Sequence, residues 1–331
     1  MRLSAFVVCL LPSVAAAQLG VTHLSPARNA LSASTESAVQ FEFDRPLDPA
    51  TVNSDTFTVF GRWTGPVGGT LQLANGNRTV LFQPDRDFTA GDLVTAGFSD
   101  AVRGMDNVPI QTGGYNYQFW TGTQRVASLA LNEIATMSTG NPSRPYGGVA
   151  TDLDNNGWLD ITLVNEDSAD LRVFMNRADG TGTFDSYAQP TYAVGNRASA
   201  SEAADFNRDG FADIAVADIN DNTISVLMGN GDGSFAPRQT IPVGFVPRGI
   251  ATLDIDGDGD TDVVNTNRSS NNLSVHINDG TGVFGTPISI DGGINQEWSL
   301  MSADMNNDGR LDLVTAAGQI RVLTANGDGT F

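Results

Sequence analysis

Cysteine is almost absent from this chain of 331 residues, in which Cys9 is the only one. It lies in an N-terminal segment that we expect to be removed, which leaves a mature chain without a thiol. Neither disulfide bonds nor thiolate chemistry can then contribute to stability or catalysis. Histidine is nearly as rare, with only His23 and His276, and no Ser/His/Asp or Cys/His set can be assembled.

Basic residues are also few. The chain has 18 Lys and Arg against 38 Asp and Glu, which gives a formal net charge of -20 at pH 7. Binding to phosphate backbones requires clustered basic side chains, so we expect no nucleic-acid partner. Thirteen of the acidic residues recur at fixed positions of four short loops, where bound cations would neutralise much of the excess charge.

Apolar runs long enough to span a membrane are missing too. Residues 1–18 contain one basic residue, a short apolar core and Ala15-Ala16-Ala17 as a cleavage site, which is typical of a secretory signal peptide. We therefore predict a signal peptide over residues 1–17 and no transmembrane segment. The product is expected to be secreted or held at the cell surface.

What the first part of the chain does contain is short runs of alternating apolar and polar residues. Such runs predict strands, and they occur at residues 38–43, 57–60, 69–73, 79–82, 93–98 and 115–120. Their spacing of roughly 10 to 20 residues, with no helical period, predicts a β-sandwich of about 100 residues. We place this domain at residues 18–122.

The second part, residues 123–331, contains an acidic loop of nine residues. Its clearest copy runs from Asp254 to Asp262 and has carboxylates at loop positions 1, 3, 5 and 9. Gly259 at position 6 can take the positive φ of a sharp turn. Carboxylates gathered in this way repel each other by roughly a few kcal/mol per close pair at an effective dielectric near 20. A hard cation offsets the repulsion, and ligands that are all oxygen favour Ca²⁺ over Mg²⁺ or Zn²⁺.

The loop occurs four times, so we predict about four Ca²⁺ sites. The candidate side-chain ligands at positions 1, 3, 5 and 9 are Asp152, Asp154, Asn156 and Asp160; Asp205, Asn207, Asp209 and Asp213; Asp254, Asp256, Asp258 and Asp262; and Asp304, Asn306, Asp308 and Asp312. An EF-hand, the competing interpretation of one loop, needs a Glu at position 12. That position holds Leu163, Val216, Asn265 and Thr315.

The loops begin at intervals of 53, 49 and 50 residues, which indicates a repeat fold. Each unit has an entering strand, the loop, a leaving strand, a third strand and a glycine-rich turn that ends in Phe, followed by a less regular fourth strand. Four strands per unit of about 50 residues is typical of a propeller blade. The last unit stops at its glycine-rich turn. Either a strand from about residues 126–137 closes a four-bladed ring, or the chain is a fragment of a longer propeller, which we favour.

The recurring D-x-[DN]-x-[DN]-G-x-x-D loop and N-G-D-G-T-F turn resemble FG-GAP or VCBS-type repeats, the calcium-loop blades of integrin α-subunit propellers and of many bacterial secreted proteins. The resemblance covers residues 145–331. It implies that the side chains at positions 1, 3, 5 and 9 bind Ca²⁺. The same resemblance adds the position 7 backbone carbonyl, which belongs to Trp158, Phe211, Asp260 and Arg310.

The run F-E-F-D-R-P-L-D-P-A-T-V from Phe41 and the block F-Q-P-D-R-D-F-T-A-G-D from Phe82 resemble a bacterial Ig-like domain. Such domains serve mostly as spacers or display modules. The resemblance therefore implies a non-catalytic role for residues 18–122.

Together these features predict an all-β protein, an Ig-like β-sandwich followed by an incomplete β-propeller of four-stranded blades. We expect a calcium-binding, non-catalytic binding or adhesion module whose partner is an extracellular protein or polysaccharide. Two alternatives stay open: a polysaccharide-active lyase or hydrolase on the same scaffold, and a spacer for a further C-terminal domain. No catalytic residue is assigned, because nearly all clustered acids are committed to Ca²⁺.

Overall fold

The structure is a computed structural model that describes residues 18–123, 136–140, 144–187, 189–293 and 295–331. Within these ranges it consists of strands and a single short 3-10 helix, η1 (Pro49–Thr51). The predicted all-β class is thereby confirmed. The predicted signal peptide and residues 126–135 of the predicted strand lie outside the described residues, and the described residues 136 and 137 are not in a strand. No helix among those described is long and apolar enough to cross a membrane.

The N-terminal part is the predicted β-sandwich of two antiparallel sheets. One sheet has the order β1 (Val21–Ser25), β2 (Val39–Phe43), β6 (Thr79–Pro84) and β5 (Gly69–Ala74). The other has the order β4 (Gly65–Pro66), β3 (Phe57–Gly61), β7 (Leu93–Phe98) and β8 (Tyr115–Trp120). All six predicted strands are confirmed, and β1 and β4 are additions that the alternation did not reveal.

Aromatic side chains fill the space between these two sheets. Alternate residues of β2 are buried, and the Phe41 ring lies 4.8 Å from that of Phe98 and 5.2 Å from that of Tyr117, centroid to centroid. Both contacts are edge-to-face, the geometry that aromatic quadrupoles favour. The period of two along β2 therefore places its apolar face in one continuous core.

The C-terminal part forms one antiparallel sheet per repeat. The first three sheets are β9 (Pro145–Thr151), β10 (Asp160–Asn165), β11 (Asp170–Phe174), β12 (Tyr192–Ala193); β13 (Ala198–Ala204), β14 (Asp213–Asp218), β15 (Thr223–Leu227), β16 (Gln239–Pro242); and β17 (Pro247–Leu253), β18 (Asp262–Asn267), β19 (Asn272–His276), β20 (Ile288–Ile290). The fourth sheet has three strands, β21 (Ser299–Ala303), β22 (Asp312–Ala317) and β23 (Gln319–Leu323). Strands follow one another in chain order, as the repeat pattern predicts.

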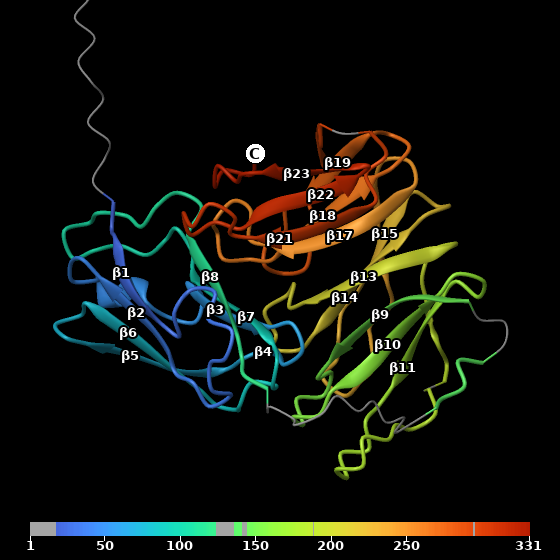
Figure 1. Cartoon of the computed structure of the whole chain (residues 1–331), viewed down its shortest axis with the longest axis horizontal. Helices are drawn as coiled ribbons and strands as arrows, with labels where there is room; N and C mark the ends of the chain where they lie inside the picture. The colour runs from blue at the N-terminus through green and yellow to red at the C-terminus, as the bar shows by residue number, and fades with distance from the viewer. Residues whose placement is uncertain (1–17, 124–135, 141–143, 188, 294) are drawn as a thin grey trace, which may run out of the picture.

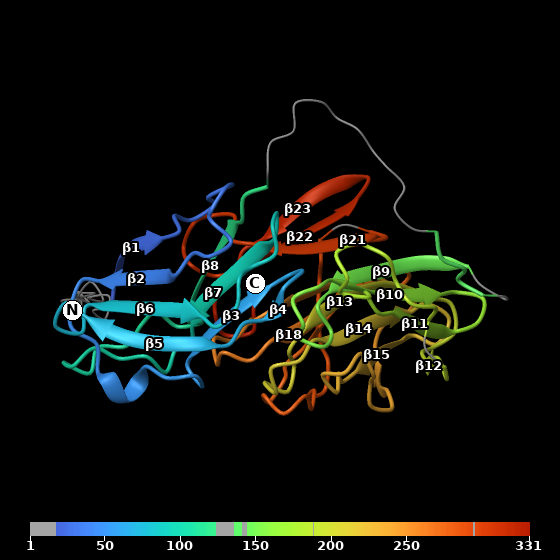
Figure 2. The same ribbon diagram turned by 90° about the horizontal axis from the view of Figure 1, so that it is seen from below.

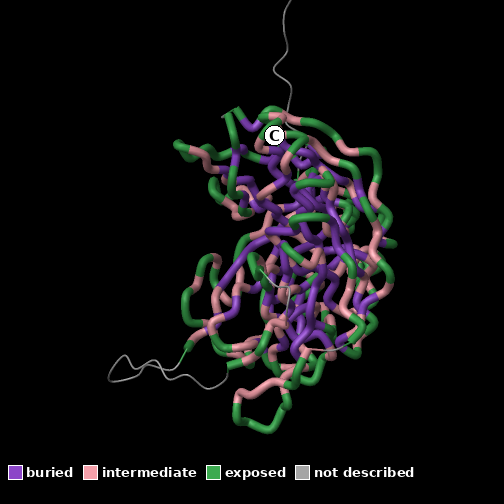
Figure 3. The backbone as a smooth tube through the Cα atoms, turned by 90° about the vertical axis from the view of Figure 1, so that its right-hand side faces the viewer, coloured by how far each residue is buried: buried purple, intermediate pink, exposed green. Residues whose placement is uncertain are grey.

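The first strands of the repeats lie side by side around a common centre, since β9 contacts β13, β13 contacts β17 and β17 contacts β21. Small residues permit this approach. A Cβ at Gly147 would lie 2.1 Å from the backbone oxygen of Ser199, and one at Gly249 would lie 2.7 Å from the backbone nitrogen of Leu300. Seen from the side, the backbone has an open, C-shaped outline with buried residues along its middle (Figure 3).

The β-sandwich packs against one face of the repeats and contacts all four of them. Figures 1 and 2 show the sandwich strands (blue to cyan) on one side of the molecule and the repeats (green to red) on the other. The acidic loops lie on the side of the repeats that meets the sandwich. Backbone hydrogen bonds such as Asp100 N–H to Gly257 O (2.6 Å) join the two parts there. The sandwich therefore contacts the candidate metal loops, although parts of these loops stay exposed.

Candidate metal centres

Each acidic loop connects the first strand of a sheet to its second strand. Position 1 follows the first strand, and position 9 is the first residue of β10, β14, β18 or β22. The turn needs two left-handed residues. Position 6 is glycine in all four loops, with φ between 86° and 93°, and position 4 is Asn155, Arg208, Gly257 or Asn307, with φ between 57° and 85°. Glycine and asparagine adopt this conformation most readily.

The position 1 carboxylate organises the loop around itself. In the first loop Asp152 accepts the backbone N–H groups of Asn156 (3.1 Å) and Gly157 (2.9 Å). The second and fourth loops repeat this pattern at Asp205 and Asp304. The chain is thereby wrapped around one negative charge, which the backbone dipoles partly stabilise.

The position 9 aspartate has a structural role that the sequence did not reveal. This aspartate is fully buried in every loop. In the third loop Asp262 accepts the backbone N–H of Ile255 on one oxygen and that of Asn278, after β19, on the other, both at 2.8 Å. The other three loops have the same pair of bonds. Position 9 therefore ties the loop to the end of the third strand. Each of its oxygens keeps a second lone pair for a cation.

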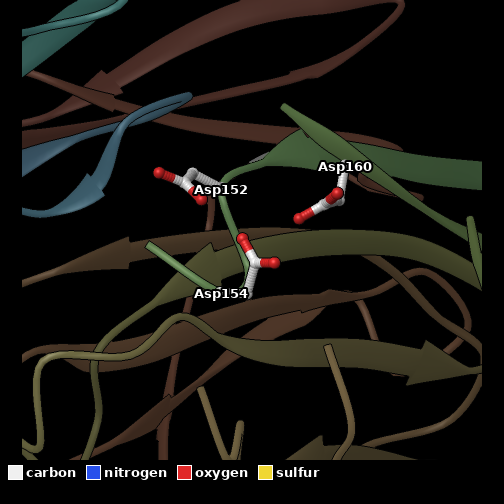
Figure 4. A group of neighbouring side chains, drawn as sticks. All are labelled: Asp152, Asp154 and Asp160. Atoms are coloured by element: carbon white, nitrogen blue, oxygen red, sulfur yellow. The ribbon is translucent and has the colours of Figure 1, made fainter. Parts of the chain in front are cut away.

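The structure brings positions 1, 3 and 9 together in two loops. Carboxylate oxygens of Asp152, Asp154 and Asp160 lie within 4.8 Å of one another, and those of Asp254, Asp256 and Asp262 do the same. Figure 4 shows the first group, with its carboxylates gathered around one turn. Two oxygens that each bind Ca²⁺ at about 2.3 to 2.6 Å can be at most about 5 Å apart. The donor chemistry and the spacing both fit this ion.

Other predicted ligands are arranged differently. Asp258 at position 5 is not part of the third loop's group, and it accepts the backbone N–H of Asp260 at 2.8 Å. Where asparagine stands at position 3, its amide donates to the position 5 carboxylate, from Asn207 to Asp209 at 2.8 Å and from Asn306 to Asp308 at 3.0 Å. The side chains at positions 3 and 5 therefore lie within hydrogen-bond distance of each other in the second and fourth loops. The position 7 carbonyl remains a prediction.

Electrostatic strain is present in these groups of carboxylates. Burial, and then the charges of Asp205 and Asp209, raises the pKa of Asp213 to about 7. Burial likewise raises the pKa of Asp160 to about 6, and it raises the pKa values of Asp254 and Asp262 well above their ordinary range. A cation bound among these oxygens would lower these pKa values, because it would replace the hydration lost on burial and would screen the repulsion between the carboxylates.

Two arginines of the β-sandwich contact the first and fourth loops. Arg86 forms an ion pair with Asp152, and Arg28 forms one with Asp304. The aspartate side chains are 2% and 5% exposed, so both pairs are largely screened from water. Arg86 is held by the backbone oxygens of Thr64 (2.6 Å) and Pro66 (2.9 Å). Nothing in the sequence spacing indicated these pairs.

The remaining loops contact the sandwich through backbone groups and one arginine. The Arg208 guanidinium donates to the backbone oxygens of Asp55 (2.9 Å) and Gly259 (2.6 Å). The third loop also accepts Asp100 N–H at its Gly257 oxygen (2.6 Å), and the fourth loop accepts Asn116 N–H at its Gly309 oxygen (2.6 Å). A cavity of about 560 Å³ lies between the two parts, lined by Phe57 and other sandwich residues on one side and by Ile250 and neighbouring first strands on the other.

Comparisons with known proteins agree with the two-part architecture. The model of the FG-GAP-like repeat matches residues 152–216, 205–265 and 254–315, and the model of the bacterial Ig-like domain matches residues 15–121. No curated protein matches this sequence.

Several solved structures show a limited likeness. A lectin from Agrocybe aegerita that recognises non-reducing terminal N-acetylglucosamine is 20% identical, with 85% of this chain and 76% of that chain covered and a TM-score of 0.45. A putative 6-phosphogluconolactonase from Bacteroides uniformis is 13% identical, with 88% and 79% covered and a TM-score of 0.40. CopC from Methylosinus trichosporium is 14% identical, with 34% and 100% covered and a TM-score of 0.25. These TM-scores are too low to transfer a function.

Proposed function

We propose that this protein, a bacterial Ig-like domain followed by FG-GAP-like repeats, is an extracellular calcium-binding module that binds a partner without catalysing a reaction. The observation that carries the proposal is the convergence of three carboxylates in each of two loops. The same backbone pattern recurs in the other two loops, where asparagine takes the place of one aspartate. Four related sites at repeat intervals favour a structural use of the ion.

Ca²⁺ would supply charge neutralisation and a rigid link between loop oxygens. Asp254, Asp256 and Asp262 would hold the ion in the third loop, and the equivalent residues would do so elsewhere. Extracellular sites of this kind bind with affinities of about 10⁻⁴ to 10⁻³ M. The third loop carries the most carboxylates, so we expect it to bind most tightly.

The non-catalytic part of the proposal is supported by the environment of His276. This residue is fully buried in β19, and its Nε2 lies 3.1 Å from the Asn265 side-chain oxygen. A histidine enclosed in this way is not accessible to a substrate. Turnover of a polysaccharide by the purified protein would contradict this part and favour the lyase or hydrolase alternative.

Isothermal titration of the chelator-treated full chain with CaCl₂ tests the calcium sites. We expect about four ions per chain in the millimolar range, with weaker heats for MgCl₂. Asp256→Asn should weaken one site about tenfold or more, because it removes a charged ligand. Asp185→Asn, at an exposed position outside the loops, is the matched control and should leave all sites unchanged. Absence of binding at several millimolar Ca²⁺ would overturn the proposal.

A further inference from the structure

The face of the repeats opposite the acidic loops is built from equivalent residues. The first strand of each repeat ends at its loop, so its start lies at the other end of the sheet. The residues six positions before the loops are Tyr146, Ser199, Arg248 and Trp298. All four line one hollow of about 180 Å³. The repeats thus place one side chain each around a shared recess.

Positive charge gathers at this recess, although the chain as a whole is strongly acidic. The guanidinium groups of Arg248 and Arg268 each lie 4.6 Å from the centre of the Trp298 ring. Two cations held beside one aromatic ring are stabilised by its quadrupole, but they also repel each other. Positive charge on Arg197 and Arg268 is among the causes that lower the pKa of Arg248, after burial.

Two glutamates lie beside this group, and each already has an arginine partner. Glu166 lies 3.3 Å from Arg144 and 3.7 Å from Arg197. Glu202, which also lines the hollow, is already paired with Arg62 of the Ig-like domain at 3.0 Å.

Arg248 and Arg268 themselves lack a carboxylate partner in the described part of the chain. Arg268 donates to the Gln296 amide oxygen at 3.2 Å. The Nε atoms of both arginines are buried and have no hydrogen-bond partner there. The nearby carboxylate of Glu297 lies against Gly292 instead. Because these two guanidinium groups have no carboxylate partner in the described part of the chain, they keep a positive charge that an anion in the hollow would neutralise.

We propose that one surface patch binds the anionic groups of an extracellular acidic polysaccharide. This arginine–aromatic patch consists of Arg197, Arg248, Arg268, Trp298 and Tyr146. This inference rests on the proposed binding function and specifies its ligand class. Guanidinium groups bind carboxylate or sulfate through paired donors, and the sequence contains arginine but no lysine. Tyr146 and Trp298 are 55% and 45% exposed, which offers apolar surface beside the charges. The hollow of about 180 Å³ is large enough for one sugar ring, and a cluster of cations suits a polymer with repeated negative charges.

Binding of the full chain to immobilised polymers in 2 mM CaCl₂ tests the proposal. The probes are polygalacturonate, dextran sulfate, neutral dextran and poly-L-glutamate. We expect binding to polygalacturonate or dextran sulfate, which distinguishes carboxylate from sulfate recognition, and none to neutral dextran. Affinity should fall as the salt concentration rises. Tighter binding to poly-L-glutamate than to both acidic polysaccharides would overturn the proposal in favour of an acidic protein partner.

Variants locate the site. Arg248→Gln combined with Arg268→Gln should reduce the affinity at least tenfold, and Arg197→Gln, at an exposed position that leaves the core intact, should reduce it severalfold. Arg177→Gln, a charge-matched change at an exposed arginine paired with Asp185 in the first repeat's glycine-rich turn, should have no effect. Equal losses in Arg177→Gln and the patch variants would overturn the proposal. A chain that binds Ca²⁺ but no acidic polysaccharide would overturn it too, while leaving the calcium-binding function intact.

Discussion

At the scale of single residues, the position 9 aspartate combines two roles in one side chain. Both oxygens of Asp262 accept backbone N–H groups, and the residue has no exposed surface. It therefore holds the loop in place whether or not an ion is bound. Position 3 lacks this pair of bonds to the neighbouring strand, so we expect its side chain to matter mainly when Ca²⁺ is present.

Asp262→Asn should consequently destabilise the repeats even in excess chelator. The amide nitrogen cannot accept a hydrogen bond, so one buried N–H loses its partner at a cost of about 1 to 3 kcal/mol. Denaturant unfolding with EDTA measures this loss. Asp256→Asn is the control, and it should lower stability only in Ca²⁺. Equal behaviour of the two variants in EDTA would contradict a structural role for position 9.

His276 predicts a pH dependence. Burial lowers its pKa from 6.5 to about 4, so the folded chain keeps the ring neutral while the unfolded chain protonates it below pH 6.5. Its contribution to stability is complete above pH 6.5 and is lost as pH falls towards 4, by up to about 3 kcal/mol. The measured quantity is the unfolding free energy of wild type minus that of His276→Gln between pH 7 and 4. A difference that does not change with pH would contradict the assignment.

At the scale of elements, the close approach of the first strands depends on glycine. Gly147 in β9 lies against the Ser199 backbone oxygen in β13, where a Cβ would be 2.1 Å away. The period of about 50 residues predicted that these strands exist. It did not predict which residue meets which neighbour, because the spacing between sheets depends on side chains from two repeats at once.

Gly147→Ala should therefore separate β9 from β13 and lower stability by about 1 to 3 kcal/mol. Thermal unfolding of the calcium-loaded chain measures the effect. Gly285→Ala is the matched control, because its nearest neighbour, the Ile277 backbone oxygen, lies 3.6 Å from the new Cβ. A loss no larger than that of the control would show that the two strands tolerate a wider spacing.

At the scale of the whole molecule, the Ig-like domain is docked on the acidic loops. Arg28 and Arg86 pair with aspartates at the two ends of the row of loops. The described residues of the fourth repeat also bond directly to the domain, since Gln111 donates to the Asp308 backbone oxygen at 2.8 Å. Stiffening of the loops by Ca²⁺ should therefore also hold the domain in position.

Arg28→Ala combined with Arg86→Ala should loosen this docking, because breaking largely buried ion pairs costs about 3 to 5 kcal/mol each when one partner is left unpaired. The expected result is a larger radius of gyration in small-angle X-ray scattering, and chelation of the wild type should shift it in the same direction. Arg45→Ala removes a pair confined to the Ig-like domain and should leave the radius unchanged. A variant as compact as wild type would show that the arginines do not secure the domain.

Local patterns in the sequence were sufficient for most of the strands and for the loops. The alternation in β2 and the Asp-rich nonapeptides act through bonds between near neighbours, such as Gly259 N–H to Asp254, so the residues themselves determine them. The tertiary structure alone decided that Arg28 meets Asp304, 276 residues away, that position 9 reaches the third strand, and that Arg248 shares an aromatic ring with Arg268. Such contacts depend on how whole sheets and domains pack, because side chains distant in the sequence meet only when many weaker interactions have already positioned the backbone.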